Sequence, residues 1–174
     1  KNTVLFLASL VFYAWGEPRY VVVMLISILL GYIFGILIER FRGGRGAKVL
    51  LFLSVASSLS FLIYFKYVDF FITNWNAVTG LSVPLLRIAL PIGISFYTFQ
   101  ILSYTVDVYR GDVRAQKNPI NLAAYIALFP QLIAGPIVRY SDIDRQLVER
   151  KHSLEKTALG IRRFIIGLGK KILI

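Results

Sequence analysis

The chain has 174 residues, of which 57% are hydrophobic and only 17% are charged, against roughly 25% charged residues in an ordinary soluble domain. This composition predicts a membrane protein. The chain has no cysteine, which excludes a disulfide, a thiol nucleophile and a thiolate metal site within it. Its single histidine and scattered carboxylates form no metal-ligand cluster. The net charge is +11, and the basic residues that produce it lie between the apolar runs, where the positive-inside rule expects them. We therefore expect no nucleic acid partner.

Apolar segments of membrane-spanning character predict an all-α, polytopic transmembrane protein, because about 20 such residues cross a bilayer core. In chain order these segments are 3–15, 20–38, 49–65 and 83–106, the last broken only by Arg87. The chain opens with Lys1 in an apolar segment already under way and stops inside a helical pattern. We therefore expect residues 1–174 to be one partial membrane domain of a longer polypeptide.

The segment 39–48 orients the first crossings, because it carries four basic residues and one acidic residue and should be cytoplasmic. Segment 49–65 then runs outward, and the weakly charged stretch 66–82, with Trp75 and other aromatic residues, lies at the outer interface. Segment 83–106 returns inward. Earlier in the chain, Gly31 and Gly35 form a small-xxx-small pair that predicts close helix packing.

The stretch "PIGISFYTFQILSYTVDVYRG" (91–111) carries polar residues through an apolar segment. At about 100° per residue, five of them fall on one face: Gly93, Tyr97, Gln100, Tyr104 and Asp107. Intramembrane polar residues usually face the protein interior or a hydrated passage, and we expect this face to do so. Two structural alternatives stay open: Gln100 cross-links helices, and Asp107 forms a helix-end ion pair with Arg110.

The apolar segment 120–138 lies between two basic flanks, residues 110–118 and the chain beyond 138. A single crossing would place one basic flank outside, against the positive-inside rule. A re-entrant segment resolves this conflict, and the two prolines and one glycine of "FPQLIAGPIV" (129–138) suit an interrupted helix at membrane depth. An ordinary crossing with a kink is the alternative.

The last segment, 154–174, has one apolar helical stripe with steps of four and three residues. Lys156, Arg163 and Lys170 repeat on the opposite side. This pattern predicts a basic amphipathic helix in the inner interface. The alternative is a helix that packs against another part of the protein.

Catalytic signatures fail in this chain. A nucleophile elbow that starts at Gly93 would need a glycine where Tyr97 stands. The "GLGKK" stretch (167–171) lacks the upstream glycine of a P-loop. We therefore predict no catalytic residue and no metal site within the chain.

Three ordered blocks, residues 90–111, 122–143 and 161–174, resemble the membrane-bound O-acyltransferase family. The likeness is to its bacterial branch of alginate O-acetyltransferases and related polysaccharide acetylation proteins. With weaker matches at 9–20 and 64–71 it covers nearly the whole chain, which would correspond to the N-terminal part of such a protein.

The resemblance implies a multi-pass protein of the bacterial cytoplasmic (inner) membrane, with a tunnel that carries an acyl group from the cytoplasmic side. It implies acetyl transfer to hydroxyls of an extracytoplasmic polysaccharide, acetyl-CoA as the donor, no bound cofactor, and a periplasmic or extracellular acetylation partner. The family's catalytic histidine lies in a later segment and is not His152, so this part alone should be inactive. The matching blocks place five substrate-binding residues on the tunnel wall: Tyr97, Gln100, Tyr104, Gln131 and Arg139.

A transporter or channel-like conduit without covalent chemistry is the rival interpretation, since polar helices and re-entrant segments also build conduits. A histidine in an apolar segment downstream of Ile174 would discriminate in favour of the enzyme.

Overall fold

The computed structural model describes residues 1–132, 135, 138–149 and 153–173. His152 and four residues of the predicted re-entrant segment lie outside the described residues. The chain forms two compact units, Lys1–Asp144 and Arg145–Ile174.

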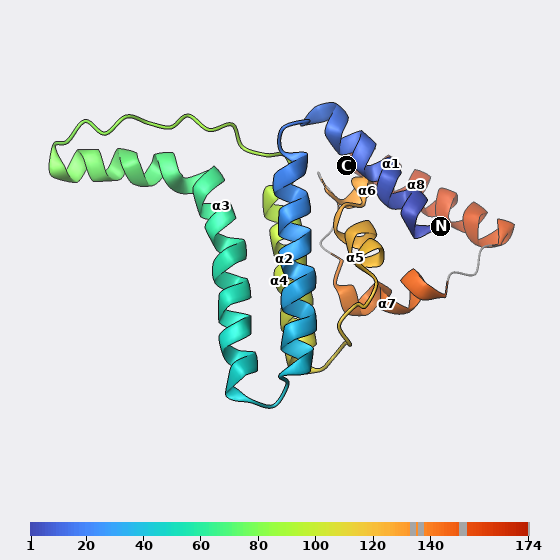
Figure 1. Cartoon of the computed structure of the whole chain (residues 1–174). Coiled ribbons are helices and arrows are strands. Elements are labelled where there is room, and N and C mark those ends of the chain that lie inside the picture. The colour runs from blue at the N-terminus through green and yellow to red at the C-terminus, as the bar shows by residue number, and fades with distance from the viewer. Residues whose placement is uncertain (133–134, 136–137, 150–152, 174) are drawn as a thin grey trace. The chain divides into compact units, whose positions relative to one another are not determined.

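Helices make up the secondary structure of the described residues, and the predicted all-α fold is confirmed (Figure 1). In chain order they are α1 (Asn2–Gly16), α2 (Val21–Arg40), α3 (Arg45–Thr79), α4 (Ile94–Arg110), α5 (Pro119–Ile126), α6 (Phe129–Leu132), α7 (Tyr140–Val148) and α8 (Leu154–Leu173). Helices α2 and α3 are long and apolar enough to cross a membrane, and α1 is a shorter apolar helix.

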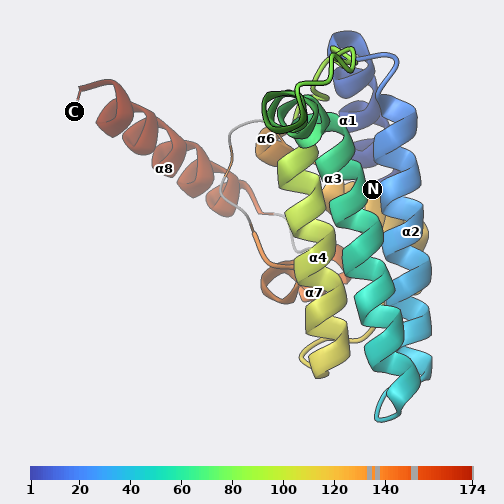
Figure 2. The ribbon, with the colours of Figure 1, turned by 90° about the vertical axis from the view of Figure 1, so that its left-hand side faces the viewer.

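Helices α2, α3 and α4 lie side by side and form the centre of the first unit (Figure 2). The predicted packing role of the two glycines is confirmed, because both face α4. A Cβ atom on Gly31 would lie 2.8 Å from Ile101 Cγ2, and one on Gly35 would lie 2.6 Å from Tyr104 Oη. Only glycine at these positions allows the two helices to approach so closely.

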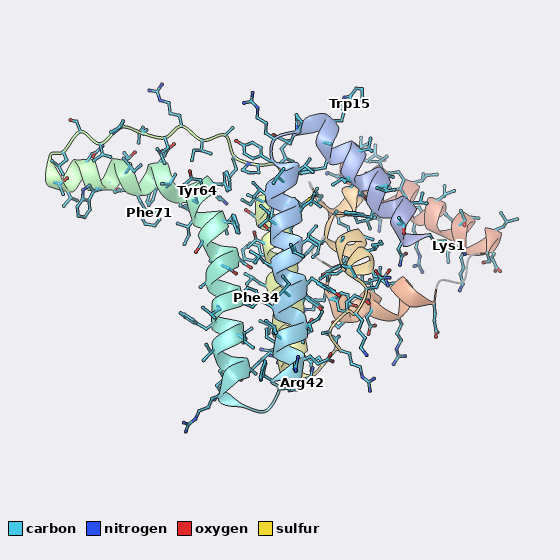
Figure 3. The ribbon with its side chains drawn as sticks, in the orientation of Figure 1. Lys1, Trp15, Phe34, Arg42, Tyr64 and Phe71 are labelled. Atoms are coloured by element: carbon cyan, nitrogen blue, oxygen red, sulfur yellow. The ribbon has the colours of Figure 1, made fainter. Side chains whose placement is uncertain are left out.

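Helix α3 is too long for a single crossing. Its 35 residues span about 52 Å at 1.5 Å per residue, whereas the hydrocarbon core is about 30 Å thick. The helix turns aside after Tyr64, and Phe71 lies on the part beyond the turn (Figure 3). Residues 66–79 of α3 and the segment 80–91 that follows lie alongside each other, and we refer to residues 66–91 as the arm (Figure 1).

The apolar segment predicted at 83–106 is divided in the structure. Residues 80–91 form no regular secondary structure, and α4 begins at Ile94. Pro84 and Pro91 cannot donate a backbone hydrogen bond, which disfavours a helix through this region. Gly93, with φ 75°, supplies the left-handed residue from which α4 starts. Only the second part of the predicted segment is therefore helical.

Helix α5 begins where Asn118 accepts a hydrogen bond from the Ile120 N–H at 2.9 Å and Pro119 follows as the first helical residue. Both features are typical helix starts. Helix α5 packs against α1, α2 and α4, while α6 meets α1 through the Phe12–Phe129 ring pair, with centroids 5.1 Å apart. The path of segment 120–138 in a membrane stays a prediction.

In the second unit, α8 confirms the helix expected at the end of the chain, apart from Ile174, which lies outside the described residues. None of the described α8 residues is buried. Its position at a membrane surface stays a prediction.

Candidate functional site

The polar face of α4 points into the first unit, as the sequence predicted. Tyr97 and Tyr104 are 0% exposed, Gln100 is 1% exposed and Asp107 is 8% exposed. Their burial follows from packing, since α4 lies against α2 and α3 on one side and meets α5 on another. The helical spacing therefore did identify a row of inward-facing side chains, although the buried side of α4 is wider and also includes Ile94, Thr98, Ile101, Thr105 and Val108.

Several buried oxygens of this row and of α6 lack a hydrogen-bond partner within the described part of the chain. They include Tyr97 Oη and Gln100 Oε1 on α4, and Gln131 Oε1 on α6. A buried polar atom without a partner costs about 1–3 kcal/mol. Such atoms are typical of places where water, a ligand or another part of a protein completes the bonding. The proposed cross-link role of Gln100 gains no support from Oε1.

The far end of the row is tied into a cluster of three tyrosines, Tyr104, Tyr125 and Tyr140. The Tyr104 and Tyr140 ring centroids are 4.9 Å apart, and those of Tyr125 and Tyr140 are 5.4 Å apart, both edge-to-face. The Gln116 backbone N–H donates to Tyr104 Oη at 2.9 Å, and Gln116 Nε2 donates to Tyr140 Oη at 2.8 Å. The Tyr125 hydroxyl donates to the Val138 carbonyl at 2.6 Å.

Burial raises the pKa of the Tyr140 phenol, while its hydrogen bond from Gln116 acts in the opposite direction. Desolvation disfavours the phenolate. The hydroxyl of Tyr140 therefore stays protonated at neutral pH and can serve the cluster as acceptor and donor.

The loop after α4 is held by the end of α2. Arg42 Nη2 donates to the Val108 carbonyl at 2.7 Å and to the Val113 carbonyl at 3.3 Å. Glu39 Oε1 accepts from the Ala115 N–H at 3.2 Å. Figure 3 shows Arg42 just beyond the C-terminal end of α2. The two basic segments that the sequence predicted to be cytoplasmic, 39–48 and 110–118, thus lie at one end of the helices.

The remaining predicted site residues lie near opposite ends of α4. Gln131 precedes Leu132, whose carbonyl would lie 2.7 Å from a Cβ atom on Gly93 at the start of α4. Arg139 is exposed, precedes Tyr140 of the tyrosine cluster, and lies in electrostatic range of Asp107 at the end of α4. Arg110 is in range of Asp107 as well.

The five predicted residues therefore do not form one compact pocket. Tyr97 and Tyr104 alone are separated by about 10 Å along the helix axis, at 1.5 Å per residue. The arrangement is elongated and follows α4 from Gly93 to Asp107. Chemically it offers hydroxyl and amide groups, and no group of three metal-ligating side chains gathers among the described residues.

Sequence reasoning missed Gln116, Tyr125 and Tyr140, which fix the end of the row. Tyr125 and Tyr140 lie within the second family-like block, so their aromatic character was available as a signal. Gln116 lies in a basic loop without periodicity. Its role depends on contacts with residues 12 and 24 positions away, which no local pattern reveals.

Comparison with known proteins matches the chain over its whole length. It is 41% identical over 179 residues to the probable alginate O-acetylase AlgI of Pseudomonas aeruginosa, covering 100% of this chain and 34% of that protein. The same-named protein of Azotobacter vinelandii is 41% identical over 180 residues, covering 100% of this chain and 36% of that protein. The peptidoglycan O-acetyltransferase of Helicobacter pylori is 32% identical over 197 residues, covering 98% of this chain and 37% of that protein.

The chain spans about a third of the length of these curated relatives. No family model matches the chain. No solved structure matches it significantly.

Proposed function

Since this chain belongs to the membrane-bound O-acyltransferase family, in the bacterial branch that includes alginate O-acetylases, we propose that it is part of an enzyme that acetylates an extracytoplasmic polysaccharide. The acceptor is a sugar hydroxyl and the donor is acetyl-CoA. The hydroxyl oxygen attacks the thioester carbonyl, which forms an ester and releases the thiol. A histidine base outside this chain takes the hydroxyl proton and passes it to the leaving thiolate, which departs as the thiol.

In this proposal the described part supplies a wall of the acyl path and the scaffold around it. The observation that carries it is the row of buried oxygens without partners, Tyr97 Oη, Gln100 Oε1 and Gln131 Oε1. A passing substrate with amide or hydroxyl groups would satisfy them, and their unpaired state would lower the cost of admitting it. The proposed set of substrate-binding residues also includes Arg139 and Tyr104, although the Tyr104 hydroxyl already accepts from the Gln116 N–H and therefore also holds α4 in place.

We further propose that segment 120–138 is re-entrant in the bacterial inner membrane. Support comes from the Gln116–Tyr140 hydrogen bond of 2.8 Å, because the chain leaves and rejoins the same neighbourhood on either side of the segment. Single cysteines at the exposed positions Lys117 and Ser141 should then both react with a membrane-impermeant reagent from the cytoplasmic side only. Labelling of Ser141 from the outside would refute the re-entrant path.

The helix α8 fits the inner interface in the same proposal. Its exposed apolar residues, among them Ile161, Phe164 and Ile165, are 56%, 68% and 61% exposed, and the helix also carries basic residues, two of them in its last turn. Anionic lipid would satisfy both features. A periplasmic or extracellular acetylation protein would receive or present the acceptor on the opposite side.

The test is transfer of labelled acetyl from acetyl-CoA in membranes that contain the full-length protein with its acceptor and partner. We expect label in the polysaccharide, and a loss of most transfer in Gln100→Leu, which keeps the size of the side chain and removes its amide. Thr105→Val is the matched control, because Thr105 is equally buried on α4 but already donates to its own helix, to the Ile101 carbonyl at 3.1 Å.

Normal transfer in Gln100→Leu would show that Gln100 does not lie on the acyl path. A similar loss in Thr105→Val would show that replacing any buried polar residue of α4 with an apolar one disturbs the helix. Absence of transfer in the unmodified protein, with donor, acceptor and partner supplied, would favour the conduit without covalent chemistry.

A further inference from the structure

The arm, residues 66–91, is held together by hydrogen bonds between α3 and the segment that returns along it. Asn76 of α3 binds the backbone of Val83 in the returning segment. Its Nδ2 donates to the Val83 carbonyl at 2.9 Å and its Oδ1 accepts from the Val83 N–H at 3.0 Å. Nearer to the turn of α3, Asp69 accepts from the N–H groups of Leu86 and Arg87 at 2.8 and 3.0 Å. Two side chains of α3 thus fasten the returning segment along its length.

The spacing of Asp69 and Asn76 along α3 matches the spacing of their hydrogen-bond partners along the returning segment. From Asp69 to Asn76 the helix rises about 10 Å at 1.5 Å per residue. From Val83 to Leu86 or Arg87 an extended chain covers about 10–13 Å at 3.3 Å per residue. Arg87 adopts φ 48°, a conformation that costs an ordinary residue about 1–2 kcal/mol. Paired backbone N–H groups on one carboxylate offset this cost.

The backbone of the returning segment determines where the arm can lie in a membrane. Apart from the N–H groups of Leu86 and Arg87, residues 84–90 make no backbone hydrogen bond within the described part of the chain. Lipid-exposed backbone in this state is not tolerated in the hydrocarbon core. The arm therefore fits the headgroup region, where its aromatic residues are also favoured.

Between α3 and the returning segment the arm forms a groove of about 480 Å³, lined by Phe71, Ile72, Asn74, Trp75, Val78 and Val83. Its one polar lining residue, Asn74, donates through Nδ2 to the Phe70 carbonyl of its own helix at 2.7 Å. The lining is otherwise hydrocarbon and aromatic, and Trp75 is 60% exposed. The groove thus suits an apolar occupant.

Exposed apolar side chains continue from the groove along α3 into its membrane-spanning part, where Phe52 is 71% exposed and Ile63 is 46% exposed. The groove lies on the same helix and the arm fits the headgroup region, so the acyl chains of the adjacent leaflet are the apolar groups nearest to it. We propose that the groove binds an acyl chain of a membrane phospholipid, held beside Trp75 by the fastened arm. This site is separate from acetyl transfer and does not depend on that activity.

The experiment uses full-length protein in vesicles of phosphatidylethanolamine and phosphatidylglycerol, with a photoactivatable diazirine in a fraction of the acyl chains. After irradiation, mass spectrometry maps the labelled peptides. We expect label in residues 71–83. Val78→Trp, at a position 86% exposed, should fill the groove and lower this label several-fold. Val49→Trp is the matched control, because Val49 is 57% exposed on the same helix outside the groove.

A third variant distinguishes binding of an acyl chain in the groove from nonspecific contact between lipid and the surface of α3. Asn76→Ala releases Val83 from α3 without changing a lining residue, so label in 71–83 should fall while label around Phe52 stays unchanged. The proposal is overturned if residues 71–83 carry no label, if Val78→Trp labels like the unmodified protein, or if Val49→Trp lowers the groove label equally.

Discussion

The contact between Gly35 and Tyr104 makes a quantitative prediction about how α2 and α4 pack. A Cβ atom on Gly35 would lie 2.6, 2.7 and 2.9 Å from Oη, Cε1 and Cζ of Tyr104. The ring cannot move away freely, because it is 0% exposed and packs against Tyr140 at 4.9 Å. Gly35→Ala should therefore force the helices apart or displace the ring from its hydrogen bond with Gln116.

Overpacking of this kind costs about 1–3 kcal/mol, and loss of the hydrogen bond adds about 1 kcal/mol. We expect Gly35→Ala to lower the free energy of unfolding by about 2–4 kcal/mol. Gly31→Ala should cost less, because only Ile101 Cγ2 lies within 3.0 Å of the added atom. Gly16→Ala is the control, since its Cβ would meet nothing within 4 Å.

The assay is unfolding of the full-length protein in mixed micelles by titration with a denaturing detergent. Adding Tyr104→Phe to Gly35→Ala removes the nearest of the three atoms, so the double variant should be more stable than the sum of the two single effects predicts. Equal stability of Gly35→Ala and Gly16→Ala would refute the packing argument. Strict additivity in the double variant would show that Oη is not the atom that clashes.

Three further outcomes follow from the hydrogen bonds. Arg42→Met removes a cation from two backbone carbonyls and should lower the free energy of unfolding by about 2 kcal/mol, whereas Arg45→Met on the exposed start of α3 should change it little. Asp69→Ala should speed hydrogen exchange of the amides at 86–87, read by mass spectrometry; unchanged rates would contradict the fastening of the arm. Because burial raises the pKa of Tyr140, stability should fall as pH rises above its unfolded value of about 10, and Tyr140→Phe should reduce that fall in alkaline unfolding titrations.

The helical periods made the central part of the fold predictable. The steps of three and four from Gly93 to Asp107 identified buried positions on α4, and the Gly31–Gly35 pair indicated close helix packing without indicating that α4 is the partner. Both depend on side-chain direction within one helix, which the sequence encodes directly. The start of α4 was less accessible, because apolar composition alone does not distinguish a helix from the extended chain at 84–91.

The arm and the tyrosine cluster could not be predicted, since they depend on contacts between distant positions. Asn76 and Asp69 look like ordinary polar residues at the end of an apolar segment. Their function appears only when the returning backbone lies beside them. Gln116 is similar, since it joins Tyr104 to Tyr140 through one backbone and one side-chain donor.

The two ends of the polar row of α4 are suited to different tasks. At Tyr104 the hydroxyl is engaged by Gln116 and the ring is held by Tyr140, so this end fixes the helix against the loop that α2 clamps. At Tyr97 and Gln100 the buried oxygens have no partner within the described residues, so a ligand placed there would supply the missing hydrogen bonds. If the row lines an acyl path, Gln100→Leu should weaken transfer, because it removes a buried oxygen that a substrate would otherwise pair. Tyr104→Phe should instead lower stability first, because it deprives the part-buried Gln116 N–H of its acceptor.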